Sequence, residues 1–210
     1  MSKNLINNEK LAVIGCSGLV GSSILRCALE KGYEVNGTMR NIEDSTKINY
    51  LKKLKNFEKL NLFKAEMSNE NDFNFCLQDI STLFIACLVP TYKGFDGTLA
   101  KELDDKRGYN EIINPTVNGC INILKSAKKL DVKNVVICSS TSSTNPIPPV
   151  PIKNEIDHWS DEIEQCKSKK YTSATKTIME KAAIKFCNEN NIRLSIICLL
   201  YTSPSPRDCQ

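Results

Sequence analysis

Short apolar runs and longer amphipathic segments alternate along most of this 210-residue chain. The short runs are rich in Val, Ile and Leu and have the length of single strands. They predict β-strands over residues 11–15, 33–39, 60–64, 82–86, 135–139 and 194–198. In the longer segments the apolar residues recur at steps of three and four, as on one face of a helix. They predict helices over about 20–31, 45–54, 70–78, 109–130 and 172–190. This alternation is typical of βαβ units and predicts an α/β fold with a doubly wound parallel sheet.

One long segment, residues 141–170, does not follow this alternation. Its first half contains four prolines, Pro146, Pro148, Pro149 and Pro151. Prolines at this density exclude a helix or a central strand, because they cannot donate a backbone hydrogen bond. We therefore expect a long loop. Since it follows the fifth predicted strand, it would leave the sheet at its carboxyl edge and border a ligand crevice there.

The first strand–helix junction carries the clearest chemical signal. Gly15, Gly18 and Gly21 recur at steps of three between the first strand and the first helix. Glycine allows a tight turn with positive φ, and the free N–H groups at a helix start attract anions. This arrangement predicts a binding site for the pyrophosphate of a dinucleotide. The alternative is an ordinary turn rich in small residues. The predicted contacts are Gly15, Ser17, Gly18, Leu19, Val20 and Gly21.

Composition and charge narrow the classes of function. The chain is 41% hydrophobic and 25% charged, and its net charge of +4 is not gathered into a basic stripe, so nucleic-acid binding is not indicated. The ten cysteines show no two-residue gap typical of zinc or redox motifs, and His158 is the only histidine. No apolar run is long enough to span a membrane, and the polar start does not resemble a signal peptide. The sequence predicts a reduced cytoplasmic protein without a metal site.

Further segments, in this order, resemble a known family. They are Thr38-Met39-Arg40, the stretch from Asn114 to Gly119, the stretch from Val135 to Ser140, His158-Trp159-Ser160-Asp161, and the stretch from Lys176 to Ala183. Together with the glycines they make the chain similar to an extended short-chain dehydrogenase/reductase of the NAD-dependent epimerase/dehydratase superfamily. The greatest similarity is to the dihydroflavonol 4-reductase, cinnamoyl-CoA reductase and anthocyanidin reductase group. The resemblance implies an NAD(P)-binding Rossmann domain over residues 1–198.

The resemblance also implies a reaction, the reduction of a carbonyl on a small organic substrate by hydride from NADPH. The carbonyl would belong to a ketone, an aldehyde or a thioester. In the family a serine holds the substrate oxygen, a tyrosine donates the proton, and a lysine lowers the tyrosine pKa and binds the nicotinamide ribose. Ser140 matches the serine and Lys176 matches the lysine.

The tyrosine of this set is displaced by one residue. The family places it four residues before the lysine, where this chain has Thr172, and Tyr171 lies five residues before Lys176. On a regular helix five residues turn a side chain by about 140° and four by about 40°. A one-residue π-bulge could correct this offset, or Tyr171 could swing inward from just before the first regular turn. Alternatively, the site lacks a donor and only binds cofactor. We expect Tyr171 to act as the proton donor.

Cofactor preference follows from the end of the second strand. Enzymes that bind NAD carry an acidic residue there for the ribose hydroxyls. This chain has Arg40, which matches the family position for the 2′-phosphate of NADPH, although a plain surface arginine is the alternative. Glu66, followed by Met67, stands where the family has an aspartate near the adenine. The run after the fourth strand, residues 86–90, is bulkier than usual in the family. NADPH is the expected cofactor.

Residues 199–210 match no motif of the family. We expect them to be a tail outside the family domain, disordered or artefactual, and the substrate lobe of the family to be largely missing. Two other functions remain open on the same scaffold. One is a nucleotide-sugar epimerase/dehydratase or a hydroxysteroid dehydrogenase. The other is a catalytically silent NADP-binding regulator, which the displaced tyrosine favours.

Overall fold

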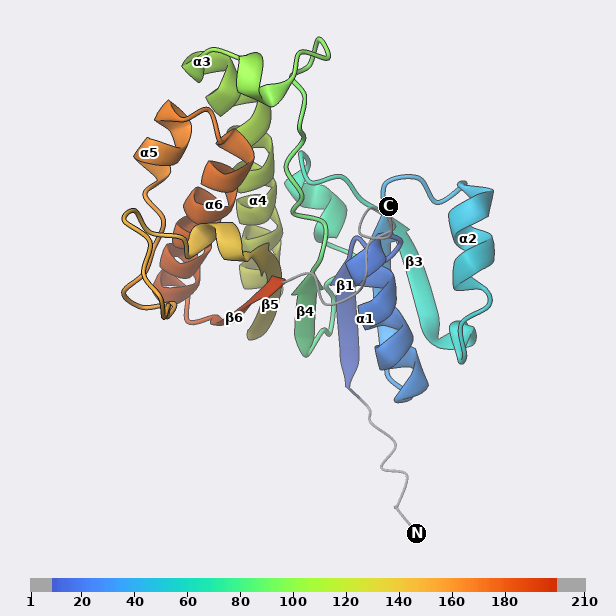
Figure 1. The fold of residues 1–210 in the computed structure, drawn as a ribbon. Coiled ribbons are helices and arrows are strands. Elements are labelled where there is room, and N and C mark those ends of the chain that lie inside the picture. Colours follow the sequence, from blue (N-terminus) through green and yellow to red (C-terminus); the bar gives the residue numbers. More distant parts are fainter. Residues whose placement is uncertain (1–8, 200–210) are drawn as a thin grey trace.

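A computed structural model describes residues 9–199 and contains, within that range, one parallel sheet (Figure 1). The strand order is β3-β2-β1-β4-β5-β6, and every neighbouring pair is parallel. The strands are β1 (Lys10–Ile14), β2 (Glu34–Met39), β3 (Leu60–Lys64), β4 (Thr82–Ile85), β5 (Asn134–Ser140) and β6 (Arg193–Leu199). Each lies within one residue of its predicted bounds at either end. The predicted α/β fold with a doubly wound parallel sheet is confirmed.

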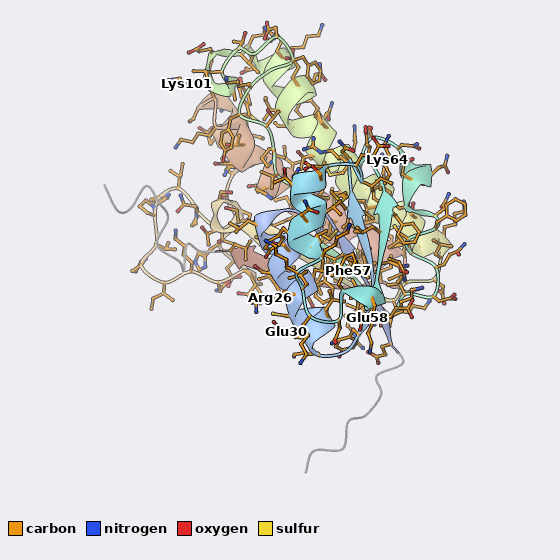
Figure 2. All side chains as sticks on the ribbon, turned by 90° about the vertical axis from the view of Figure 1, so that its right-hand side faces the viewer. Arg26, Glu30, Phe57, Glu58, Lys64 and Lys101 are labelled. Atoms are coloured by element: carbon orange, nitrogen blue, oxygen red, sulfur yellow. The ribbon has the colours of Figure 1, made fainter. Side chains whose placement is uncertain are left out.

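Helices cover both faces of this sheet, and the alternation of side chains along β1 shows the two layers. Leu11 and Val13 pack with α1 (Leu19–Glu30) and α2 (Ser45–Leu51), whereas Ala12 and Ile14 pack with α4 (Asn114–Lys129) and α6 (Tyr171–Glu189). On the surface of α1, Arg26 pairs with Glu30 at 3.2 Å (Figure 2). No helix between residues 9 and 199 combines the length and apolar character needed to cross a membrane. The cytoplasmic location stays a prediction.

The shorter elements lie in the connections between these strands and helices. They are η1 (Phe57–Lys59), η2 (Glu70–Phe73), η3 (Ala100–Glu102), α3 (Asp105–Arg107), η4 (Gly108–Ile113), η5 (Thr141–Ser143) and α5 (Glu162–Lys167). The segment from η3 to η4 rises above the carboxyl edge of the sheet and meets the start of α6 (Figure 1). The segment from η3 to η4 therefore borders the edge of the sheet where a ligand of this fold is expected.

Two predicted helices differ from those observed. The helix expected over 70–78 is only the 3-10 turn η2, because Asn69 and Asp72 accept hydrogen bonds from the nearby main chain and so compete with a helix. The helix expected over 109–130 begins as the π-helical turn η4 and continues as α4. Pro115 has no N–H to donate to the carbonyl of Glu111, so regular α-helical bonding cannot run through this point.

The predicted loop over 141–170 is not wholly irregular. It contains η5 and α5, whereas residues 144–161, which include the four prolines, and residues 168–170 have neither helix nor strand. Asp161 begins α5 by accepting hydrogen bonds from the N–H groups of Ile163 at 2.8 Å and Glu164 at 3.1 Å. Ser160 ties the loop back to the end of β5, because its hydroxyl donates to the carbonyl of Ser142 at 2.7 Å. The segment is therefore fastened at the carboxyl edge of the sheet.

Candidate nucleotide-binding site

The turn between β1 and α1 has no room for side chains at two of its glycines. Gly15 has a φ of +83°, and a Cβ there would lie 2.7 Å from the Cβ of Cys87. A Cβ on Gly21 would lie 2.1 Å from the carbonyl oxygen of Gly15. A Cβ on Gly18 would meet the same oxygen at an ordinary 3.5 Å. Gly15 and Gly21 are thus required for the turn to close, whereas a side chain at position 18 would fit.

The start of α1 presents its backbone donors without a side-chain partner. Gly18 is the N-cap and supplies no side-chain hydrogen bond, and the first turn carries no acidic residue. Leu19, the first residue of the helix, is 89% exposed, and Ser17 and Val20 are partly exposed. The N–H groups of this turn and the positive end of the helix dipole can therefore bind an anion. The predicted contact residues lie together around this turn.

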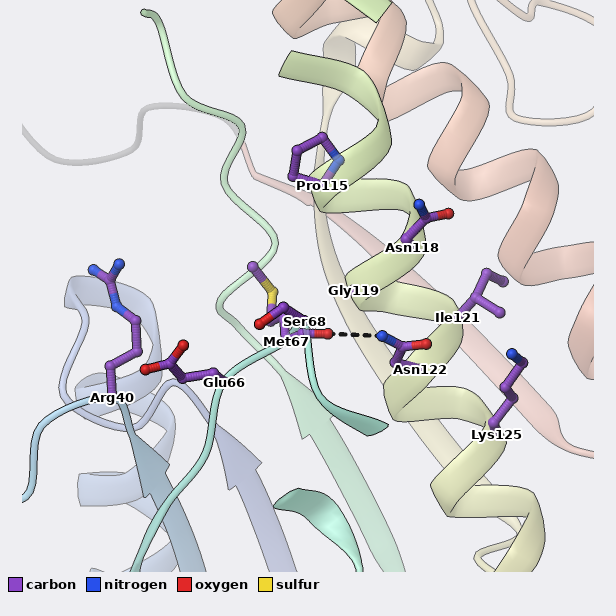
Figure 3. Close-up of a pocket in the computed structure, with 10 residues that line it drawn as sticks. All are labelled: Arg40, Glu66, Met67, Ser68, Pro115, Asn118, Gly119, Ile121, Asn122 and Lys125. Atoms are coloured by element: carbon purple, nitrogen blue, oxygen red, sulfur yellow. Dashed lines mark hydrogen bonds between the residues drawn. The ribbon is translucent and has the colours of Figure 1, made fainter. Parts of the chain in front are cut away.

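A pocket of about 610 Å³ opens at the carboxyl ends of β2 and β3. Arg40 and Glu66 lie on one side of it, and α4 forms the other wall (Figure 3). Both side chains are exposed. Arg40 follows β2 directly, and one residue separates Glu66 from the end of β3. The pocket thus places a cation at the end of β2 beside an open space that α4 bounds. The residues that line it are Arg40, Glu66, Met67, Ser68, Pro115, Asn118, Gly119, Ile121, Asn122 and Lys125.

The α4 wall of this pocket was not predicted as part of the site. The side-chain amide of Asn122 donates to the carbonyl of Met67 at 2.9 Å. Gly119 faces Met67 so closely that a Cβ would lie 2.7 Å from the Met67 Cβ. These contacts hold Met67 against the helix at the wall of the pocket. The stretch from Asn114 to Gly119 was the available signal, because an Asn-Gly pair inside a long helix indicates a close approach.

Lys176 and Ser140 lie at the carboxyl ends of β4 and β5. The Lys176 ammonium donates to the carbonyl of Leu88, in the segment that follows β4. Burial lowers the pKa of this ammonium, and the nearby Glu180 carboxylate opposes that effect. Ser140 ends β5, and its hydroxyl accepts a hydrogen bond from the Ser142 N–H at 3.3 Å. η5, which follows Ser140, packs on α6, the helix that carries Lys176.

Glu180, one turn after Lys176, is a charged residue that the sequence did not single out. It is only 3% exposed and accepts a hydrogen bond from the hydroxyl of Ser139. Burial raises the pKa of its carboxyl group, while the hydrogen bonds from Ser139 and Ser143 and the Lys176 charge lower it. Glu180 therefore links α6 to the end of β5.

Tyr171 has contacts that lead away from Lys176. Its hydroxyl donates to Asp105 at 2.9 Å, and the carbonyl of Leu103 lies 3.4 Å from the same oxygen. Burial, and then the bond to Asp105, raises the pKa of Tyr171 to about 12. Helix α6 is regular from Tyr171 onward, so it has neither the bulge nor the inward swing that would bring this hydroxyl to the lysine. The assignment of Tyr171 as proton donor stays a prediction.

Comparison with known proteins decides the family. The model of the NAD dependent epimerase/dehydratase family matches residues 11–205. The chain belongs to this family. The match runs past the boundary expected at residue 198. Residues 200–210 lie outside the described residues, so the expectation of a non-family tail stays a prediction.

The individual proteins that match this chain have the names of reductases. A bifunctional dihydroflavonol 4-reductase/flavanone 4-reductase of Malus domestica is 33% identical over 205 residues, which are 94% of this chain and 55% of the relative. An anthocyanidin reductase of Arabidopsis thaliana is 30% identical and matches 89% of this chain and 54% of its own length. The chain thus spans just over half of these relatives. The resemblance to the dihydroflavonol 4-reductase, cinnamoyl-CoA reductase and anthocyanidin reductase group is confirmed.

Solved structures agree with this fold. Vestitone reductase from alfalfa (Medicago sativa) superposes with a TM-score of 0.64 at 27% identity, over 90% of this chain and 56% of that one. The yeast methylglyoxal/isovaleraldehyde reductase Gre2, solved with NADPH, superposes with a TM-score of 0.63 at 20% identity over 90% of this chain and 56% of its own. The second likeness supports the fold alone.

Proposed function

We propose that this chain is the NADP(H)-binding half of a reductase that acts on the carbonyl group of a small organic molecule. One observation carries the proposal. The turn between β1 and α1 excludes side chains at Gly15 and Gly21, and Arg40 stands at the end of β2 beside an open pocket. A pyrophosphate requires such a turn, and a 2′-phosphate requires such a cation.

Each part of the cofactor then has a group to bind it. The N–H groups at Leu19 and Val20 bind the pyrophosphate, since the Gly18 N–H already donates to the Gly15 carbonyl at 3.1 Å. The Arg40 guanidinium binds the 2′-phosphate. The pocket between Glu66 and α4 takes the adenine. Lys176 is close enough to the end of β4 to bind the nicotinamide ribose. NADPH supplies a hydride when it is bound, and the Ser140 hydroxyl orients the substrate oxygen for that chemistry.

The names of the relatives support reduction rather than epimerisation. Dihydroflavonol 4-reductase, anthocyanidin reductase and cinnamoyl-CoA reductase each denote reduction, and they match about nine-tenths of this chain. Arg40 supports the same choice, because an acidic residue at the end of β2 would favour NAD. A nucleotide-sugar epimerase/dehydratase therefore has less support, and so does a hydroxysteroid dehydrogenase, which no relative named above represents.

A second candidate function has one specific observation in its favour. A reductase needs a proton donor, and the Tyr171 hydroxyl is hydrogen-bonded to Asp105 instead of facing Lys176. In that arrangement the chain binds NADPH without reducing a substrate, which is the behaviour of a cofactor-binding regulator. Under the first candidate, Tyr171 must leave Asp105 before it can donate a proton.

Two linked assays test these proposals on the purified 210-residue chain. Nicotinamide fluorescence first measures NADPH binding, and loss of nicotinamide absorbance then follows its oxidation with a panel of ketones, aldehydes and thioesters. Oxidation that depends on a carbonyl substrate, and that Tyr171→Phe abolishes at unchanged NADPH affinity, supports the reductase with its predicted donor. Binding without oxidation by any substrate supports the regulator. A folded chain that binds no NADPH overturns both candidates.

A further inference from the structure

The start of α6 is held by a small apolar cluster separate from the main core. Tyr171, 1% exposed, is its largest member and packs with the segment that connects β4 to α4. The cluster consists of Ala100, Leu103, Ile112, Ile113, Tyr171 and Ala174. Because α6 also carries Lys176, the position of the lysine depends on how this end of the helix is fastened.

Both the ring and the hydroxyl of Tyr171 have a contact that suits them. The ring lies over Gly108, where a Cβ would come within 2.4 Å of the Tyr171 Cζ. The hydroxyl, beyond the ring, donates to the Asp105 carboxylate at 2.9 Å. The groups that face this hydroxyl are Asp105 and the Leu103 carbonyl, with Asp104 and Cys166 further away. A glycine is therefore required where the ring lies, and an acceptor stands where the hydroxyl ends.

We infer that Tyr171 is a positioning residue, a clamp that fastens α6 to Asp105 and Gly108, and that Thr172 is the hydroxyl residue that faces the crevice beside Lys176. The inference about the clamp stands on these contacts alone. The part that concerns Thr172 rests on the proposed cofactor site, and its readout is chosen so that it does not require turnover.

The pattern of exposure along α6 supports the second half of this inference. Tyr171, Ala174 and Thr175 are buried, whereas Thr172 and Lys176 are both partly exposed. Four residues along a regular helix turn a side chain by only about 40°, so Thr172 and Lys176 share one face. A threonine hydroxyl is a much weaker acid than a phenol. The chain therefore places a hydroxyl before the lysine without the acidity that proton donation requires.

A double-mutant cycle tests the clamp through the packing of the ring. Gly108→Ala forces a methyl group against the ring, so we expect it to lower the folding equilibrium constant by roughly 10- to 100-fold when Tyr171 is present. In the background of Tyr171→Ala the ring is gone, and the same change should cost less than about threefold. Urea unfolding measures all four proteins. An equal cost of Gly108→Ala in both backgrounds would overturn the clamp.

Tyrosine titration tests the contacts of the hydroxyl. Tyr171→Phe removes a phenol whose pKa lies above the usual tyrosine value of about 10. The number of phenols that ionise near the usual value should therefore stay unchanged. The matched control is Tyr109→Phe, which removes a phenol that is 47% exposed. If Tyr171→Phe lowers that number by one, the Tyr171 hydroxyl is not held by Asp105 and the inference is wrong.

The variant Thr172→Tyr tests the position of Thr172. Placed one turn before Lys176, a new phenol should ionise at a lower pH than an ordinary tyrosine, because the ammonium favours the phenolate. Thr172→Phe provides the baseline for the difference spectrum. A new phenol that titrates at or above the usual value would show that position 172 does not face Lys176. This readout needs neither cofactor nor substrate, so its failure is distinct from failure of the proposed function.

Discussion

Gly21 lies where α1 passes closest to the turn that precedes it. A Cβ added there would lie 2.1 Å from the carbonyl oxygen of Gly15, 2.8 Å from its carbonyl carbon and 3.1 Å from the Cα of Cys16. All three atoms belong to the main chain, so no side-chain rotation can relieve the overlap. Gly21→Ala must therefore move either the turn or the first turn of α1.

The expected cost follows from two opposing effects. Overpacking of this kind destabilises a protein by about 1–3 kcal/mol, and overlap with main-chain atoms places Gly21→Ala toward the upper end of that range. Alanine is favoured over glycine within a helix by about 0.5–1 kcal/mol, which offsets part of the cost. The net loss should be about 1.5–2.5 kcal/mol, or roughly a 10- to 70-fold fall in the folding equilibrium constant.

Gly18→Ala is the matched control in the same turn. Its Cβ would stand 3.5 Å from the Gly15 carbonyl oxygen, an ordinary contact, and its φ of −79° suits any residue. Its cost should stay below about 1 kcal/mol, since alanine is only a poorer N-cap than glycine. Urea unfolding of the wild type and both variants measures the difference. If Gly21→Ala is as stable as Gly18→Ala, the close approach of α1 to the turn is wrong.

Arg40, the cysteines and Glu180 can each be tested by a single change or reagent. Arg40→Met should weaken NADPH binding by roughly 10- to 100-fold and leave NADH binding unchanged, because charge-assisted bonds to the 2′-phosphate are lost. Arg26→Met, on the far surface of α1, should change neither affinity. Exposed Cys27 should react with a thiol reagent in the folded chain at neutral pH, whereas Cys16 should not, because burial raises its pKa to about 12. Burial also raises the pKa of Glu180 above its unfolded value, so the stability gained from its protonation is present below the unfolded pKa and lost as the pH rises through the folded pKa. Urea unfolding across this range should show a smaller pH dependence in Glu180→Gln than in the wild type; equal dependence would contradict this prediction.

The features predicted well from the sequence are those set by residues near one another in the chain. Strand β5 could be predicted from a run of four apolar residues, because such a run is typical of a strand whose two faces are both covered in a parallel sheet. The glycine turn follows from spacing alone, because its close approach is made within seven residues, from Gly15 to Gly21. Arg40 could be placed in the pocket because it follows β2 directly.

The features missed depend on contacts between distant segments. Nothing near Tyr171 in the sequence indicates that its hydroxyl binds Asp105, 66 residues earlier, or that its ring needs Gly108. The π-helical turn η4 arises where the helix meets Pro115, a case that apolar periodicity does not detect. The α4 wall of the pocket was missed for the same reason, since Asn122 contacts Met67 across 55 residues of chain.

We propose above that this chain binds NADP(H) and distinguishes it from NAD(H). The most direct measurement is a titration of the unmodified 210-residue chain with NADPH and, separately, with NADH, followed by nicotinamide fluorescence. We expect saturable binding of NADPH that is tighter than that of NADH by roughly tenfold or more, because Arg40 makes at least one charge-assisted contact with the 2′-phosphate. Equal affinities, or a preference for NADH, would contradict the role of Arg40, and a folded chain that binds neither cofactor would contradict the nucleotide site itself.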